Sequence, residues 1–207
     1  MSVVRCLGIF IDRQLTFDHH IKTVSKSSFS SIRAIYRIRK YLSERTSTIL
    51  VSAFVSSRLD YCNSLLNACT SRRLIRLQRI VNVCARLVKR LPRRSPTSET
   101  LRQLQWLPVK QRIAFKLACL VHKCVHGAAP FYLCELLSPA ASSDIGICLR
   151  SQSALRLYEP SYRLQSFRGG FVFCAPRIWN SLSPECRRLT NFRLFKRCLK
   201  RELLASL

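Results

Sequence analysis

Apolar residues recur at helical spacing over most of the chain, and this pattern predicts a mainly α-helical protein. Between Leu74 and Leu91, apolar side chains alternate at intervals of three and four residues. That spacing is typical of the buried face of a packed helix, and this run is short for a coiled coil, so we expect a helical bundle. The heptad seam comprises Leu74, Leu77, Val81, Cys84, Val88 and Leu91. Pro92 and Pro96 end this helix.

Two more helices are predicted before the seam. The first covers about residues 19–42 and the second begins at Ser43, a residue type that favours helix N-termini, with Glu44 in the first turn. The residues expected on the inner side of the first are Ile21, Val24, Ser28, Ile32, Ile35 and Ile38. Those expected on the inner side of the second are Ile49, Leu50, Ala53, Phe54, Tyr61 and Leu65.

Shorter helices are predicted after Pro96. The ranges are 98–106, 108–126, 130–137, 176–182 and 191–204. Pro108 suits a first helical turn and Gly127 a C-terminal end. Residues 138–149 are rich in small side chains and predict a connector. Residues 150–175 favour a loose hairpin or extended segment.

The N-terminal apolar run predicts a short β-strand. Val3 to Ile11 is brief and rich in β-branched residues. Gly8 within it indicates a bulge or a close approach of another segment. A strand with unpaired edges is also a place where another chain can pair.

Charge identifies the class of partner. The 207 residues contain 36 Lys and Arg against 10 Asp and Glu, a formal net charge of +26. Such an excess favours binding to a polyanion, and nucleic acid is the first expectation, with an anionic membrane surface as the alternative. No apolar run is long enough to span a bilayer, so we expect no membrane span.

Location follows from the N-terminus and the cysteines. We find no secretory signal. The 11 cysteines lie mostly in apolar helical stretches, where reduced thiols act as small hydrophobic residues. We therefore expect an intracellular protein of the nucleus or cytoplasm that is not secreted.

The strongest candidate site is the basic side of the helix that carries the heptad seam. Its outward heptad positions hold Arg72, Arg76, Arg79, Arg86, Arg90 and Arg93. Nine basic residues and no acid lie between Ser71 and Arg94. A merely solvated helix would usually interleave Glu for favourable pairs. The pattern therefore predicts contacts with nucleic-acid phosphates, with a passive surface as the alternative.

Two other helices repeat this design. The C-terminal helix has Phe192, Phe195, Leu199 and Leu203 on one side. Its basic candidates are Arg193, Lys196, Arg197 and Lys200, followed by Arg201. Nucleic acid, a membrane surface, a calmodulin-like groove and a passive surface remain open as partners for it. The first helix adds Lys22, Lys26, Arg33, Arg37, Arg39 and Lys40.

Metal and catalytic chemistry find little support in the sequence. Cys119, His122 and His126 share one helix face, but no Cys-x-x-Cys pair exists to complete a zinc site, so we expect no metal or other cofactor. The acids are scattered singly, whereas polymerase chemistry needs clustered carboxylates that hold two metals. We expect Asp60 to pair with a nearby Arg. No catalytic residue and no small-molecule substrate are indicated.

Five phrases occur in a fixed order that resembles a known family. They are LGIFID (7–12), RLDYCNSL (58–65), WLPVK (106–110), APRIWNSL (175–182) and FRLFKRCLKREL (192–203). Trp106 and Trp179 within them are expected in the core. Over nearly the whole chain the set resembles the C-terminal part, the thumb and beyond, of the reverse transcriptase of jockey-type and chicken-repeat-type non-LTR (LINE) retrotransposons.

The resemblance implies a division of the chain. Residues 1–17 would be a remnant of the palm sheet and residues 18–92 a basic, thumb-like helical bundle. Residues 97–138 would add further helices, and residues 139–207 a mixed C-terminal segment ending in a basic helix. In this family the thumb packs along the template–primer duplex, which implies RNA, DNA or their hybrid as partner.

The resemblance also implies what the chain lacks. The family's catalytic aspartates precede the LGIFID-like strand, and Cys6 is only five residues after Met1. We therefore expect a reverse transcriptase fragment without the palm and endonuclease, not an enzyme as it stands, with a polymerase palm in trans as a possible partner. The alternatives are a helical protein-interaction module and a decayed transposon copy without selected function.

Overall fold

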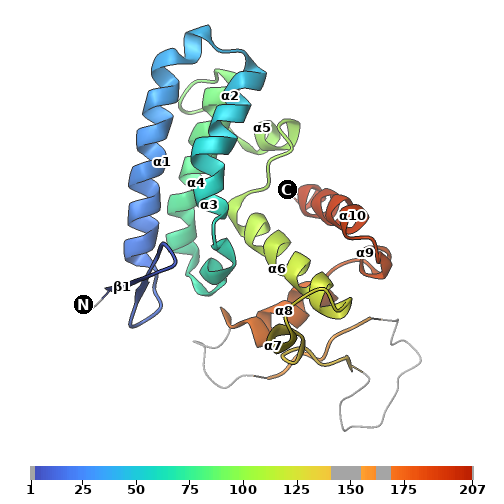
Figure 1. The fold of residues 1–207 in the computed structure, drawn as a ribbon. Helices are drawn as coiled ribbons and strands as arrows, with labels where there is room; N and C mark the ends of the chain where they lie inside the picture. Colours follow the sequence, from blue (N-terminus) through green and yellow to red (C-terminus); the bar gives the residue numbers. More distant parts are fainter. Residues whose placement is uncertain (1–2, 141–154, 162–168, 207) are drawn as a thin grey trace. The chain divides into compact units, whose positions relative to one another are not determined.

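The computed structural model describes residues 3–140, 155–161 and 169–206 (Figure 1). It is mainly helical with a short N-terminal two-stranded hairpin, which confirms the predicted fold class. The chain forms two compact units, residues 1–112 and residues 113–206. Most of the predicted connector at 138–149, and parts of the predicted hairpin at 150–175, lie outside the described residues.

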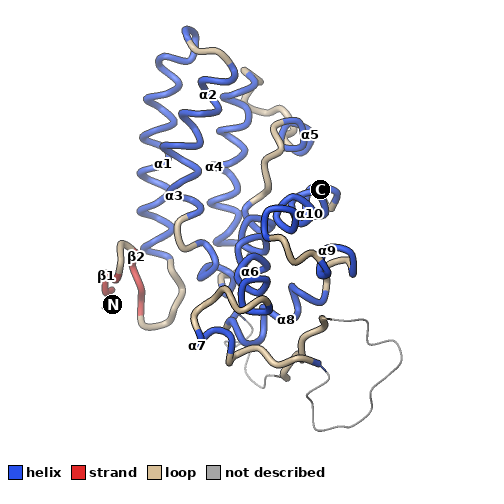
Figure 2. The backbone as a smooth tube through the Cα atoms, turned by 45° about the vertical axis from the view of Figure 1, so that its right-hand side comes forward, coloured by secondary structure: helices blue, strands red, loops and turns tan. Residues whose placement is uncertain are grey.

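Three helical rods make up most of the first unit (Figures 1 and 2). α1 (Asp18–Ile38) ends in a 3₁₀ turn, η1 (Arg39–Tyr41), where the chain reverses. The returning rod is α2 (Glu44–Val51), the π-helical turn η2 (Ser52–Ser56) and α3 (Ser57–Asp60). After a second reversal through η3 (Asn63–Ala68), α4 (Ser71–Lys89) runs parallel to α1, and the short α5 (Ser98–Gln103) follows.

The heptad seam of α4 forms the centre of this bundle. Leu77, Val81, Cys84 and Val88 are buried as predicted. Leu74 is half-buried and Leu91 is exposed, so only the middle of the seam is covered. α4 also buries Ile80, Ala85 and Leu87, because α1 and α2 both pack against it.

The second rod begins as predicted but turns a different side inward. Ser43 Oγ accepts a hydrogen bond from the Thr46 N–H, which caps α2. The prediction that Ile49, Ala53, Phe54, Tyr61 and Leu65 face inward was wrong, since all five are exposed. The buried residues are Ser47, Val51, Val55 and Leu59, each four residues after the last. The π turn widens the helix and keeps this four-residue spacing on one face.

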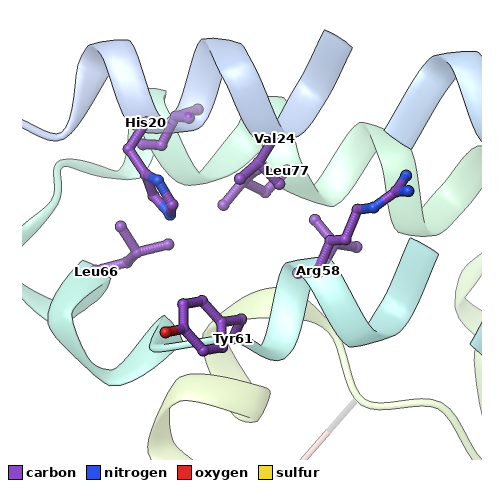
Figure 3. Close-up of a pocket in the computed structure, with 8 residues that line it drawn as sticks. His20, Val24, Arg58, Tyr61, Leu66 and Leu77 are labelled. Atoms are coloured by element: carbon purple, nitrogen blue, oxygen red, sulfur yellow. The ribbon is translucent and has the colours of Figure 1, made fainter. Parts of the chain in front are cut away.

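The lower end of the bundle is closed by aliphatic side chains around a histidine. Figure 3 shows His20 of α1 beside Val24, Leu66 and Leu77. The gap between them has no room for a water molecule. His20 Nδ1 is buried without a hydrogen-bond partner among the described residues. Burial lowers the pKa of His20, so the ring is held neutral.

The N-terminal strand proves to be a hairpin. β1 (Val3–Cys6) pairs antiparallel with β2 (Ile9–Asp12), and Val3 lies opposite Asp12. Leu7 and Gly8 form the two-residue turn. Their φ angles are 46° and 82°, and the commonest tight hairpin turn needs positive φ at both central residues. The Tyr61 hydroxyl donates to the Leu7 carbonyl at 2.6 Å and ties the turn to the returning rod.

The second unit contains shorter helices around an aromatic core. α6 (Val109–Val125) starts in the first unit and is followed here by α7 (Phe131–Cys134). α8 (Phe171–Asn180), α9 (Pro184–Arg188) and α10 (Phe192–Ala205) complete the unit. Gly127, with φ of 66°, follows the end of α6 as predicted. The predicted hairpin is wrong from Phe171 onward, because α8 begins there, five residues before the expected Pro176.

Trp179 lies at the centre of the second unit. It is fully buried, contacts the ring of Phe195, and donates its indole N–H to the Leu155 carbonyl at 2.6 Å. Asn180 bonds both the N–H and the C=O of Leu157 through its side-chain amide. These bonds fix the irregular segment around Leu155 and Leu157. Its backbone forms only an isolated bridge, between Leu157 and Pro139.

Candidate nucleic-acid interface

The predicted arginines on α4 separate into two groups. Arg72, Arg76 and Arg79 are exposed along one side of the helix at spacings of four and three residues. Arg86 continues this line but is half-buried, and its Nε donates to the Ser95 carbonyl at 2.9 Å. Only the first three therefore project freely from the helix.

Arg90 and Arg93 lie beyond the last α-helical residue. Arg90 is the left-handed C-terminal cap of α4, with φ of 53°, and its Nη2 donates to the Leu42 carbonyl at 3.2 Å. Arg93 is exposed in the loop that follows. The helix thus ends one residue before Arg90, and the heptad geometry predicted for these two residues does not apply.

Arg39 has a different role from its neighbours in the sequence. It was grouped with the surface cations of the first helix, but it is only 7% exposed. Its guanidinium donates to the carbonyls of Leu87 at 2.8 Å, Val88 at 2.6 Å and Leu42 at 2.7 Å. Carbonyls at a helix C-terminus have no partner within the helix, and Arg39 supplies one. Its side chain is thus part of the fold.

A basic groove lies where α1 and α4 both end. It has a volume of about 420 Å³. Its lining residues are Tyr36, Arg37, Arg39, Lys40, Arg86, Leu87, Arg90 and Leu91. Arg37 and Lys40 are exposed beside it, and Tyr36 is 72% exposed. Five cations and a tyrosine ring therefore border one hollow of the first unit.

The cations that border the groove act on one another electrostatically. Burial lowers the pKa of the Arg39 guanidinium, and the charge of Arg90 lowers that pKa further. Glu44 acts in the opposite direction but is already paired with Lys89 Nζ at 2.7 Å. An anion in the groove would relieve this repulsion.

Acidic residues of the first unit are occupied in structural contacts. Asp12 accepts from the N–H groups of residues 14, 16 and 17, and the bond from Thr16 is the main reason its pKa is lowered. Asp18 pairs with Arg73 at 2.8 Å. Asp60 pairs with Arg112 at 2.9 Å, which confirms the predicted Arg partner. Besides the hydrogen bond from Arg73, the charge of Arg76 also lowers the pKa of Asp18, so this carboxylate offsets part of the positive charge on the exposed side of α4. The three carboxylates come from separate segments and are not clustered as a two-metal site requires.

The C-terminal helix keeps the predicted two-sided design. Phe195 and Leu199 are buried, whereas Arg193, Lys196 and Arg197 are exposed and Lys200 is half-buried. Lys196 Nζ lies 4.8 Å from the centre of the Phe192 ring. Asn191 caps the helix by accepting from the N–H groups of residues 193 and 194. This second basic surface lies in the second unit.

The histidines considered for metal binding belong to the core of the second unit. His122 Nε2 lies 2.7 Å from the Leu189 carbonyl oxygen, and its ring stacks 4.3 Å from that of Phe195. Burial lowers the pKa of His122. Burial also raises the pKa of the Cys119 thiol, to about 11. A different group, Cys186, Cys198 and Glu202, brings its ligand atoms together.

The groove itself was missing from the sequence-based site. The basic residues that border it come from two segments about 50 positions apart, and only the parallel packing of α1 and α4 joins them. The run Arg37, Arg39 and Lys40 was a usable local signal, because it is a cationic cluster just before the capped helix at Ser43. The tyrosine at its edge carried no signal of its own.

Comparison with known proteins does not identify a family or a function for the chain. No family model, curated protein or solved structure matches the chain. Within the described residues, no helix combines the length and the apolar character needed to cross a membrane.

Proposed function

We propose that the first unit binds RNA, DNA or their hybrid through phosphates, as a thumb-like part of a LINE-type reverse transcriptase. The observation that carries the proposal is the basic groove at the ends of α1 and α4 together with the exposed arginine row, Arg72, Arg76 and Arg79, on the same helix. The ordered sequence phrases supply the family proposal, and the groove supplies the chemistry.

The dimensions of the surface suit a nucleic-acid backbone. At 1.5 Å per residue, α4 advances about 21 Å between Arg72 and Arg86. One strand of a duplex spans that distance with about six phosphates. One guanidinium group can donate two parallel hydrogen bonds to two oxygens of the same phosphate. Arginine therefore suits such a row better than lysine. Tyr36 at the groove can stack on an unpaired base. Contacts of this kind bind without sequence preference.

The test separates the two basic surfaces. Variant one replaces Arg72, Arg76 and Arg79 with Gln, which keeps helix propensity. Variant two replaces Arg193, Lys196 and Arg197 with Gln and removes the same charge from α10. Binding of the wild type should be weak, with a dissociation constant on the order of 10⁻⁴–10⁻⁶ M at physiological salt. The slope of log affinity against log salt should flatten in variant one by about 0.9 for each duplex phosphate that the protein no longer neutralises.

The two variants have distinct outcomes. Variant one should lose affinity to a similar degree for unrelated sequences, and variant two should lose less. If a folded variant one keeps the wild-type affinity and slope while variant two does not, the interface is on α10. If neither changes, the proposal fails. Circular dichroism should show that both variants remain helical.

We further propose that the chain does not itself polymerise DNA. The carboxylates Asp12, Asp18 and Asp60 each serve a structural contact, and none is paired with another acid. Purified protein with primed template, deoxynucleotides and magnesium should give no extension. Extension that survives a contaminant control would refute this.

A second candidate, a protein-interaction module, rests on exposed apolar side chains. Ile49, Phe54 and Leu65 on the returning rod are 57%, 50% and 46% exposed, and Leu7 of the hairpin is 84% exposed. Such side chains can contact another protein. Saturable binding to a protein partner, with an affinity that does not change with salt, would favour this alternative.

A further inference from the structure

Two thiols and a carboxylate meet between α9 and α10 in the second unit. The Sγ atoms of Cys186 and Cys198 and a carboxylate oxygen of Glu202 all lie within 4.8 Å of one another. Cys198 and Glu202 are four residues apart on α10 and so lie on the same side of the helix. Cys186 comes from α9 and is fully buried, whereas the other two are half-buried.

A serine fixes the orientation of this group. Ser183 Oγ donates to Glu202 Oε1, and it accepts a hydrogen bond from the Cys186 N–H at 3.1 Å as the cap of α9. The same carboxylate oxygen lies 3.9 Å from Cys198 Sγ. The carboxylate and the two thiols are therefore oriented by bonds that already exist, which is the arrangement that surrounds metal ligands in proteins.

The electrostatics of the group favour a cation. Burial raises the pKa of the Cys186 thiol, and the hydrogen bond with Cys198 and the charges of Glu202, Cys198 and Cys119 raise it further. These groups repel one another once deprotonated. A bound divalent cation reverses that effect and makes thiolates stable at neutral pH.

We propose that Cys186, Cys198 and Glu202 are three ligands of zinc or a similar thiophilic divalent cation. In a tetrahedral site with Zn–S bonds of about 2.3 Å, ligand atoms lie about 3.8 Å apart. The present separations exceed this by at most about 1 Å, which small side-chain rotations can supply. A water molecule takes the fourth position.

The binding reaction balances with release of protons. Zinc replaces the thiol protons of Cys186 and Cys198, which pass to solvent, and Glu202 binds as the carboxylate it already is. The three-ligand site then carries one net negative charge. Arg201 Nη2 lies 4.0 Å from Cys198 Sγ and offsets this charge.

The proposed site is distinct from the face that the sequence suggested. His122 is bonded through Nε2 to the Leu189 carbonyl and packed against Phe195, and it does not belong to the group of Cys186, Cys198 and Glu202. Cys186 and Cys198 are twelve positions apart, a spacing that matches no familiar zinc motif. This inference does not depend on nucleic-acid binding.

The test uses the full chain, reduced and free of chelator, and titrated with Zn²⁺ or Co²⁺. We expect one metal per chain by elemental analysis and a thiolate-to-cobalt absorption band in the near ultraviolet. Two protons should be released per zinc, one from each thiol. Cys198→Ser should abolish stoichiometric binding, and Ser183→Ala should weaken it about 10- to 100-fold.

Matched controls separate this site from other thiols and histidines. Cys134→Ser and His126→Gln lie in the same unit and should leave binding unchanged. If Cys198→Ser fails to fold, Glu202→Gln replaces it in the test, because this variant keeps the hydrogen bond from Ser183. It should bind the metal more weakly than the wild type, and unchanged affinity would contradict the proposal. A wild type that takes up no stoichiometric metal, or a folded Cys198→Ser that keeps it, overturns the proposal.

Discussion

The two compact units differ in what their polar side chains bind. In the first unit, Arg39, Arg86 and Arg90 donate to backbone carbonyls at helix ends and loops, over an aliphatic core. In the second unit, Trp179 and Asn180 fix an irregular segment over a core of aromatic rings and cysteines. Of the 36 basic residues, 22 lie in residues 1–112, against 5 of the 10 acidic residues.

This difference shows that positive charge has two uses in the first unit. Some guanidiniums complete the fold by bonding carbonyls at helix C-termini, where the helix dipole favours cations. Others, such as Arg72, Arg76 and Arg79, project from the exposed side of α4. The second unit is less basic, and its fold depends on packing around Trp179 and Phe195 instead. Substitutions in each unit therefore show whether the two sets of contacts stabilise their units separately.

The largest effect is expected for Arg39→Met. The change leaves the carbonyls of Leu87 and Val88 without a side-chain donor, whereas the Leu42 carbonyl keeps Arg90. A buried group without its partner costs about 1–3 kcal/mol. The first unit should lose about 3 kcal/mol or more of stability. Hydrogen exchange should accelerate in α1 and α4 while α8 and α10 keep their protection. Arg37→Met, at an exposed neighbour, is the control, and equal loss in both variants would refute the role of Arg39.

A smaller effect is expected for Trp179→Phe in the second unit. The change removes the donor to the Leu155 carbonyl and leaves a cavity, at a cost of about 2 kcal/mol. Protection from hydrogen exchange should fall in α8 and α10 and stay unchanged in α1. Trp106→Phe, at a half-buried position, should cost less. Uniform loss over the whole chain would show that the units do not unfold separately.

Sequence reasoning succeeded where one helix carries its own signal. Ser43 capped α2 as predicted, and Leu77, Val81 and Val88 were buried, because capping and periodicity are local properties. It failed on the returning rod, since the buried side chains there are the small and branched Ser47, Val51 and Val55 rather than the large Ile49 and Phe54. The π turn and the packing of the rod against its neighbours determine which face is buried. Neither can be predicted from the sizes of the side chains.

The candidate sites show the same limit. The arginine row on α4 was predictable, because its residues share one helix. The burial of Arg39 was not, because its partners Leu87 and Val88 are almost fifty positions away. The thiol group at Cys186 and Cys198 was missed for the same reason, since it depends on how α9 packs against α10.

Acid should destabilise the first unit through His20. Because burial lowers its pKa in the folded state, the unfolded chain binds the proton more tightly. The stabilising contribution is complete above the ordinary His pKa of about 6.5 and is lost as pH falls from there toward the lowered value. The urea midpoint of the wild type should therefore drop between pH 7.5 and 5.5. His20→Leu should remove most of this drop, whereas exposed His19→Asn should reduce it only slightly, because the charge of His19 is the smaller cause of the lowered His20 pKa.

The smallest expected effect is a gain at the hairpin turn. Leu7 adopts a φ of 46° and is 84% exposed, so its side chain incurs left-handed strain without compensating burial. Leu7→Asn should stabilise the first unit by about 0.5–1 kcal/mol, as urea unfolding can measure. Val4→Asn, at a strand residue with ordinary backbone, should give no gain. Destabilisation by Leu7→Asn would show that the exposed leucine makes a contact that strain arguments ignore.

The basic groove at the ends of α1 and α4 also has a consequence for the lifetime of the protein. Its cations repel one another in the free chain, and a ligand that binds only the folded form stabilises that form in proportion to its occupancy. If polyanions fill the groove, a chain without nucleic acid opens more often and is cut by proteases sooner. The number of protein molecules in the cell would then follow the amount of nucleic acid available to bind them. Chains in excess of that amount would be degraded without a dedicated regulator.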